Sequence, residues 1–215
     1  MVRTLAVSDE EVAGMRLGAA LRIAPALVLA AGDLAFDYLT AIADQLDRPA
    51  VMVPGNHDRD LSGYRQHRGL WMRAGRPTEW PGPAGFENAD GRIVDAAGLR
   101  IAGLGGCLRY RDGPNQWTEA QQARRAKRLV REARRAERRD GRGVDVLLTH
   151  APPRHCGDRE DGPHRGFECL HALVDQLRPQ VLVHGHIHPY GEQLPDRALG
   201  TTRVVNVVGR KVLEI

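Results

Sequence analysis

Short apolar runs alternate with amphipathic stretches along the first sixty residues. The runs over 2–7, 26–31 and 51–53 predict buried strands, and each is followed by a polar or turn-forming residue. Residues 9–22 and 34–46 carry apolar side chains at helical spacing and predict helices between those strands. The order β-α-β-α-β favours a largely parallel sheet and therefore an α/β fold.

The middle of the chain is less regular. Residues 59–90 contain scattered prolines, glycines and a few aromatic side chains, which predicts a surface loop anchored by those aromatics. The apolar pair 93–94 and the run 99–104, with Gly98 between them, predict a hairpin.

The pattern of strands and helices returns in the last third of the chain. Residues 144–148 and 181–183 predict two further buried strands, with a helix over 167–177 between them. The segments 202–208 and 211–215 close the chain and predict antiparallel strands.

Positive charge is concentrated in one predicted helix, residues 118–139. The whole chain has 31 Lys and Arg against 27 Asp and Glu, a net charge of +4. Residues 120–139 alone hold nine Lys or Arg against two Glu, so this segment is +7 and the remainder of the chain is −3. Its narrow, mostly alanine stripe predicts a helix that packs lightly, with its arginines in water. A solvated helical face and a nucleic-acid contact are both open at this point.

Length and composition restrict the class of protein. A chain of 215 residues is long enough for one sizeable core, so we expect a single domain over residues 1–215. No segment reaches the roughly 18 consecutive apolar residues of a membrane span, and the apolar run before Asp9 is too short for a secretory signal. Three cysteines without close spacing favour reduced thiols. We therefore expect a cytoplasmic protein with no membrane partner.

Polar side chains with metal-binding chemistry follow five of the predicted strands. They are Asp9, Asp33, Asn56-His57-Asp58, His150 and His186-Ile187-His188. Alone, each has an ordinary explanation as a helix cap or a polar turn. Together they offer nitrogen and oxygen ligands and almost no thiol, which suits Mn²⁺, Fe²⁺ or Zn²⁺. In an extended chain His186 and His188 would project to the same side, and Gly185 would let the backbone approach an ion closely.

In the order of these residues the chain resembles the calcineurin-like metallophosphoesterase superfamily. The match runs from position 9 to position 188, and Gly-Asn-His-Asp followed later by Gly-His-x-His is a specific signature. The resemblance implies a four-layer α/β/β/α sandwich with two divalent metal ions at the carboxyl ends of the strands.

The resemblance also implies which residues hold the ions. Asp33 would bridge the two ions, and Asp9 and His188 would bind the first of them. The second ion would be bound by Asn56, His150 and His186.

The resemblance gives two histidines no metal role. His57 would be the proton donor to the leaving group, oriented by a carboxylate such as Asp58. His184 would be a structural residue behind the ligands.

One departure from the signature affects the first ion. The superfamily has Asp-x-His where this chain has Asp9-Glu10-Glu11. Glu11 could replace the imidazole, Glu10 could approach instead, or water could fill the position, and the register of the chain favours Glu11. A carboxylate there would shift the preference toward harder ions, so Mn²⁺ is favoured.

The activity implied is hydrolysis of a phosphoester by a metal-bridging hydroxide, with His57 as general acid. A compact chain without a large cap resembles the phosphodiesterase members, so we expect a small phosphodiester or nucleotide as substrate. Candidate substrate contacts, which could equally be solvent-facing loop residues, are Arg109, Tyr110, His164 and Arg165.

Two alternatives stand beside this function. One is a nuclease or RNA-processing enzyme that uses the arginine helix, and the other is a non-catalytic scaffold with a weakened metal site. The oligomeric state is left open.

Overall fold

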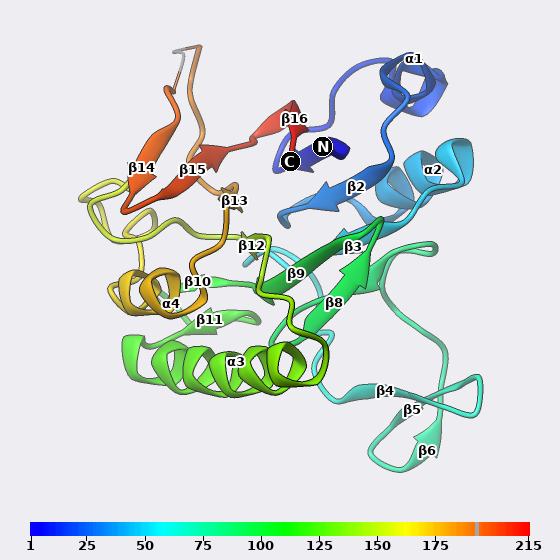
Figure 1. The fold of residues 1–215 in the computed structure, drawn as a ribbon. Coiled ribbons are helices and arrows are strands. Elements are labelled where there is room, and N and C mark those ends of the chain that lie inside the picture. Colours follow the sequence, from blue (N-terminus) through cyan, green and yellow to red (C-terminus); the bar gives the residue numbers. More distant parts are fainter. Residues whose placement is uncertain (192–193) are drawn as a thin grey trace.

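Two mainly parallel β-sheets form the centre of the molecule (Figure 1). The computed structural model describes residues 1–191 and 194–215. The first sheet has the order β16 (Gly209–Glu214), β1 (Arg3–Ser8), β2 (Leu27–Ala30), β3 (Ala50–Met52) and β7 (Glu87–Asn88). The second has the order β14 (Arg197–Leu199), β15 (Thr202–Asn206), β13 (Val181–His184), β12 (Val146–Thr149), β9 (Leu99–Leu104) and β8 (Ile93–Ala96). Only the edge strands β16, β14 and β8 pair antiparallel within these two sheets, which confirms the predicted α/β class.

Alternation along the strands builds three apolar layers. In β2, Leu27 and Leu29 face the second sheet, whereas Val28 and Ala30 face the helices outside the first sheet. The outer helices of the first sheet are α1 (Ala19–Ile23) and α2 (Phe36–Leu46), and those of the second are α3 (Glu119–Asp140) and α4 (Cys169–Leu177). Successive strand side chains point to opposite faces, so each sheet has two apolar faces. One face packs against the other sheet and the other packs against helices. The arrangement is the expected four-layer α/β/β/α sandwich.

The predicted helix over 9–22 is mostly wrong. The structure has only a 3-10 turn, η1 (Met15–Leu17), and the short helix α1 in this region. Gly14 (φ 82°) and Gly18 (φ 89°) adopt left-handed backbone conformations that end any continuous helix. As a result Asp9, Glu10 and Glu11 lie on a loop and not on a first helical turn.

The predicted surface loop over 59–90 contains a small sheet. Its three antiparallel strands are β4 (Tyr64–His67), β5 (Leu70–Arg73) and β6 (Arg76–Pro77), which Figure 1 shows projecting from the body at the lower right. The two connections, Arg68-Gly69 and Ala74-Gly75, have positive φ at both positions, as type I′ hairpin turns require. These strands could not be predicted because most of their side chains are exposed and no alternating apolar pattern marks them.

The two closing strands are not partners of each other. β15 lies in the second sheet beside β13 and β14, and β16 crosses to the first sheet, where it pairs with β1. Each therefore has an antiparallel neighbour, as predicted, but in a different sheet. A further two-stranded ladder joins β10 (Cys107–Leu108) to β11 (Gln116–Trp117) just before α3.

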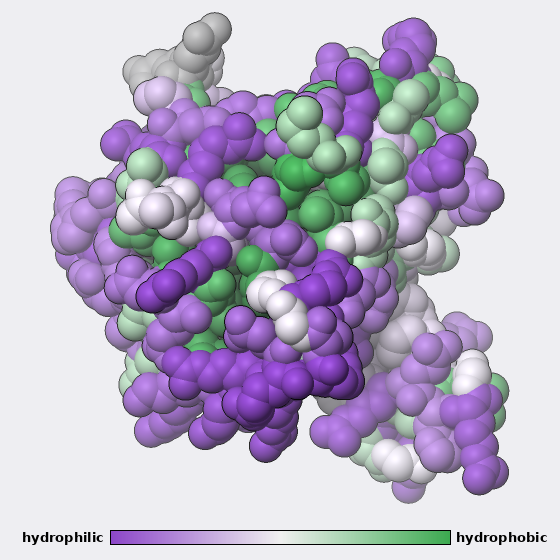
Figure 2. Space-filling model, viewed as in Figure 1, coloured by the Kyte–Doolittle hydropathy of each residue, from purple (hydrophilic) through white to green (hydrophobic). Residues whose placement is uncertain are grey.

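Helix α3 is the strongly charged element predicted from the sequence, and its surface is the hydrophilic band along the bottom of Figure 2. A capping box between Thr118 and Gln121 begins it. The prediction that its arginines lie in water is wrong for Arg125, which is buried. This guanidinium pairs with Asp90 at 2.5 and 2.6 Å, donates to the carbonyl of Gly105 and covers the ring of Trp117. In the described part of the chain, no helix is long and apolar enough to cross a membrane.

Replacing Arg125 by alanine should lower the free energy of unfolding by about 3 kcal/mol, because it breaks the largely buried ion pair with Asp90. Urea unfolding followed by circular dichroism measures this. The matched control is Lys127→Ala on the exposed face of the same helix, which should change stability by less than about 0.5 kcal/mol. Equal stability of the two variants would contradict the anchoring role of Arg125.

Candidate metal centre

Four side chains from both sheets converge where their strands end. Asp9 follows β1, Asp33 follows β2, His150 follows β12 and His186 follows β13. Each offers one ligand atom, and these four atoms lie within 4.8 Å of one another. Parallel strands place their carboxyl ends at one edge of a sheet, so residues far apart in sequence meet there.

His150 is oriented by a backbone carbonyl and is fully buried. Its Nδ1 donates to the carbonyl oxygen of Ala31 at 2.7 Å. Its Nε2 therefore faces the centre, 3.0 Å from Oδ1 of Asn56 and 3.3 Å from Oδ2 of Asp33. A metal-ligating histidine commonly makes this kind of contact through its other nitrogen.

The charges of Asp33 and His150 stabilise each other. Burial alone would lower the pKa of His150, but the adjacent carboxylate of Asp33 outweighs it and raises that pKa to about 9. Burial likewise opposes ionisation of Asp33, and His150 overcomes it, so the pKa of Asp33 falls to about 2. Between about pH 2 and pH 9 these pKa values make the pair a carboxylate beside an imidazolium at the centre of the donor group.

His186 is oriented in a similar way but stays neutral. Its Nε2 donates to the carbonyl of Pro163 at 2.8 Å, which leaves the Nδ1 lone pair free. Burial, followed by the charge of His150, lowers the pKa of His186 to about 3. Its backbone N–H donates to Asp9, and its φ of 68° is left-handed, so the extended geometry expected for 186–188 is not present. A neutral imidazole with a free lone pair is ready to bind a metal.

Close backbone approach makes the centre possible. A Cβ on Gly55 would collide with the carboxylate of Asp33, and a Cβ on Gly185 would collide with Asp9 and Ser8. Gly185 thus lets the backbone approach Asp9, one of the donors of the centre. Asp9 (φ 59°) and Asp33 (φ 57°) are themselves left-handed, a strained state that recurs at functional sites.

Asp58 does not orient His57, contrary to expectation. In residues 1–191 and 194–215 no hydrogen bond joins its carboxylate to that imidazole. Oδ2 of Asp58 instead accepts from the backbone N–H groups of Gly55 (2.8 Å) and Asp33 (3.0 Å), so it braces the two turns. Burial and the charge of Asp33 raise the pKa of Asp58 to about 6.

His57 is exposed beside the buried donors. Its backbone N–H donates to Oδ1 of Asp33 at 2.8 Å, which fixes the position of the residue. The imidazole itself faces solvent, where a substrate could reach it.

The structure separates the roles of Glu10 and Glu11. Oε1 of Glu10 lies 2.9 Å from Nδ1 of His188, whose Nε2 is 3.8 Å from Asp9. Glu11 was the favoured replacement for the missing histidine, but both its oxygens accept from Arg16, at 3.0 and 3.1 Å. This geometry therefore favours Glu10 over Glu11 as the carboxylate that approaches the centre, through His188.

The four candidate substrate residues differ in position. The hydroxyl of Tyr110 lies 3.5 Å from Nδ2 of Asn56, and the ring of His164 is 5.4 Å from that of His186. These two residues border the centre. Arg109 instead donates to the carbonyl of Gln116 and to Gln121, and Arg165 lies 3.9 Å from Glu160, so both are engaged elsewhere.

One further residue near the centre, Asn115, was not predicted. Nδ2 of Asn115 donates to the carbonyls of Gly55 and Asp58, at 2.9 and 3.1 Å, and so holds the loop between them. His184 was expected to be structural, and it is buried with its pKa lowered to about 4 by burial. The contact of Asn115 with Gly55 could not be predicted from the local Gly-Pro-Asn sequence, because Gly55 lies 60 residues away.

The chain belongs to the calcineurin-like phosphoesterase family, whose sequence model matches residues 16–190. Asp9, Glu10 and Glu11 precede the matched segment. The family relation makes the protein a metal-dependent phosphoesterase by class, and the nitrogen and oxygen donors described above fit a divalent ion.

Three similar proteins illustrate the relation. A Haemophilus influenzae protein named only as uncharacterized is 25% identical over 179 residues, covering 71% of this chain and 70% of that protein. A UPF0046 protein of Caenorhabditis elegans is 48% identical over 48 residues, which are 21% of this chain and 12% of that protein. The crystal structure of TT1561 from Thermus thermophilus aligns with a TM-score of 0.64 and 16% identity, covering 97% of this chain and 89% of that chain. This last likeness concerns the fold.

Exchange of Glu10 for alanine should weaken Mn²⁺ binding by about tenfold to a hundredfold, because His188 loses the carboxylate that orients it. Free Mn²⁺ measured by electron paramagnetic resonance during a titration gives the affinity. Glu11→Ala is the matched control and should leave the affinity unchanged, since Glu11 is bound by Arg16 at the surface. A larger loss in Glu11→Ala than in Glu10→Ala would restore Glu11 as the ligand.

Metal binding should also depend on pH. An ion at Nε2 of His150 must displace the proton that this nitrogen carries below its pKa of about 9. The association constant for Mn²⁺ should therefore rise about tenfold per pH unit between about pH 6 and pH 8. Titrations at several pH values measure this slope, and a flat profile would show that His150 loses no proton on binding.

Proposed function

We propose that this chain hydrolyses a small phosphodiester, such as a nucleotide diester, with His57 as general acid. The observation that carries the proposal is the exposed imidazole of His57 directly beside buried metal-binding groups, with its backbone bonded to Asp33. A protonated imidazole within reach of the leaving group can give its proton to a departing alkoxide.

In this proposal the donors divide between two ions. Asp33 would contact both, Asp9 and His188 would hold one, and the other would be held by Asn56, His150 and His186. When bound, such ions supply Lewis-acid polarisation and an activated water. Manganese is the preferred ion because the donors include two carboxylates and one amide oxygen, which are hard ligands.

The residues of the chain supply the remaining steps. Tyr110, beside Asn56, and His164, beside His186, would contact the substrate next to the phosphorus atom. His57 would protonate the leaving oxygen, and Asp58 would keep the Gly55 and Asp33 turns fixed while it does so. Arg109 and Arg165 are given no step, because their contacts are with Gln116, Gln121 and Glu160 and not with the donors of the centre.

A non-catalytic scaffold is the second candidate. It is favoured by one observation, the replacement of the signature histidine by glutamate, which leaves the first ion with fewer imidazole ligands. A scaffold, however, has no need for an exposed imidazole fixed against Asp33.

The first test compares bis(4-nitrophenyl) phosphate with 4-nitrophenyl phosphate in the presence of Mn²⁺. We expect faster turnover of the diester. Faster turnover of the monoester would make the protein a phosphatase, and no turnover of either by the metal-loaded protein would support the scaffold.

Replacing His57 by alanine should lower kcat by about a hundredfold or more while the metal content stays unchanged. The loss should grow when 4-nitrophenol is exchanged for phenol as leaving group, since the more basic phenolate needs the proton more. His67→Ala, an exposed histidine on β4, is the control and should keep full activity. Metal loss in the His57 variant, or an equal rate loss for both leaving groups, would contradict the role of general acid.

A further inference from the structure

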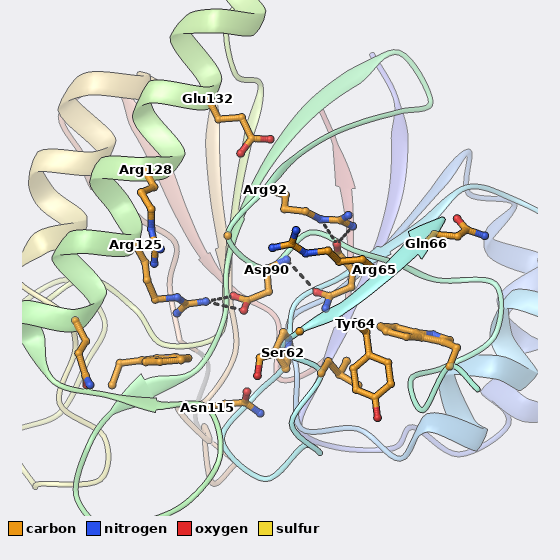
Figure 3. A pocket seen from close by; sticks show the side chains of 18 of the residues that line it. Ser62, Tyr64, Arg65, Gln66, Asp90, Arg92, Asn115, Arg125, Arg128 and Glu132 are labelled. Carbon is orange, nitrogen blue, oxygen red and sulfur yellow. Dashed lines mark hydrogen bonds and ion pairs between the residues drawn. The ribbon is translucent and has the colours of Figure 1, made fainter. Parts of the chain in front are cut away.

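A groove of about 940 Å³ lies between α3 and the small β4–β6 sheet (Figure 3). Side chains of α3 form one wall, and residues of β4 and β5 form the other. The donors of the metal centre do not line it. Pro54 and Asn115 do, and Asn115 also bonds the carbonyls of Gly55 and Asp58. The groove therefore adjoins the loop that carries His57 without being part of the metal centre.

Unpaired positive charge faces this groove. Five arginines and two carboxylates line it, which gives a net charge of +3. Arg125 is neutralised by Asp90, and Glu132 accepts from the backbone of Ile93. Arg92 lies 3.8 Å from Glu87. The other three arginines, which are exposed and have no ion pair within the described part of the chain, are Arg65, Arg124 and Arg128. In Figure 3 Arg128 extends from α3 on one side, and Arg65 lies on the other.

Aromatic rings line the same groove. Trp71 and Trp80 stack at 4.2 Å between centroids, and Tyr64 meets Trp80 edge to face at 5.8 Å. Trp117 lies at the α3 side beneath Arg125. All three tryptophans of the chain are thus in the lining of this groove, although the protein is poor in aromatic residues.

We propose that this groove binds single-stranded nucleic acid. Exposed arginines on both walls match a run of phosphates, and partly exposed aromatic rings match unstacked bases. A duplex would leave the aromatic rings unused because its bases are already stacked, and a plain polyphosphate has no bases to offer. The volume is at the upper end for small-molecule pockets, which leaves room for more than one nucleotide.

The proposal goes beyond the proposed hydrolysis and does not depend on it. The basic residues of α3 lie on two different faces of the helix. Arg124 and Arg128 face the groove, together with Gln121 and Arg125. Lys127 and Arg138 are exposed on the same helix but do not line the groove, because their positions are turned away from that stripe at 3.6 residues per turn.

Tryptophan fluorescence reports on the groove directly, because no tryptophan lies elsewhere. The protein is titrated with an oligothymidylate of about twelve nucleotides in the presence of EDTA, so that no metal-dependent hydrolysis occurs. We expect quenching of the fluorescence and binding that weakens steeply between about 50 and 200 mM salt. No quenching at low salt would overturn the proposal. Tighter binding of a duplex, or equal quenching by inorganic polyphosphate, would also overturn it.

A pair of charge-reversal variants locates the binding. R124E/R128E should weaken binding by at least tenfold and lower the slope of log K against log salt by about 2. The control K127E/R138E has the same change in net charge on the same helix and should bind within about threefold of wild type. Circular dichroism confirms that both fold. Equal losses in the two variants would show a diffuse attraction to the helix and contradict a site in the groove.

Discussion

The contact between Asp33 and His150 joins the two sheets at their carboxyl ends, and the other donors are arranged around it. Asp33 follows β2 in the first sheet, and His150 follows β12 in the second. The second nitrogen of His150 bonds the carbonyl of Ala31, so the ring is fixed from both sides. Opposite charges allow both groups to remain ionised in a buried place, where either alone would be costly.

The parts of the site that follow a strand directly could be predicted from the sequence. A buried strand and its terminal turn are local patterns, and Asp33, His150 and His186 are found where those patterns placed them. The class of fold could be predicted for the same reason. The family signature then related these positions to one another, which no local pattern could do.

What the sequence could not predict was decided by contacts between distant segments. Glu10 approaches the centre because it contacts His188, and Glu11 does not because it is bound by Arg16. The contact with His188 could not be predicted, since that residue lies 178 positions further along the chain. Asp58 braces two turns and leaves the ring of His57 free, since the N–H groups of Asp33 and Gly55 are nearer partners. The small sheet over β4–β6 was missed because its strands bury little, and the groove that it forms with α3 was missed with it.

We propose that Asp33, His150 and their neighbours form a divalent metal site between the two sheets. An anomalous difference map from a crystal soaked in Mn²⁺ tests this site. We expect a strong peak within coordination distance of Oδ2 of Asp33, Nε2 of His150 and Oδ1 of Asn56. A map with no peak there, or with manganese bound only at surface carboxylates, would show that these residues do not hold the ion.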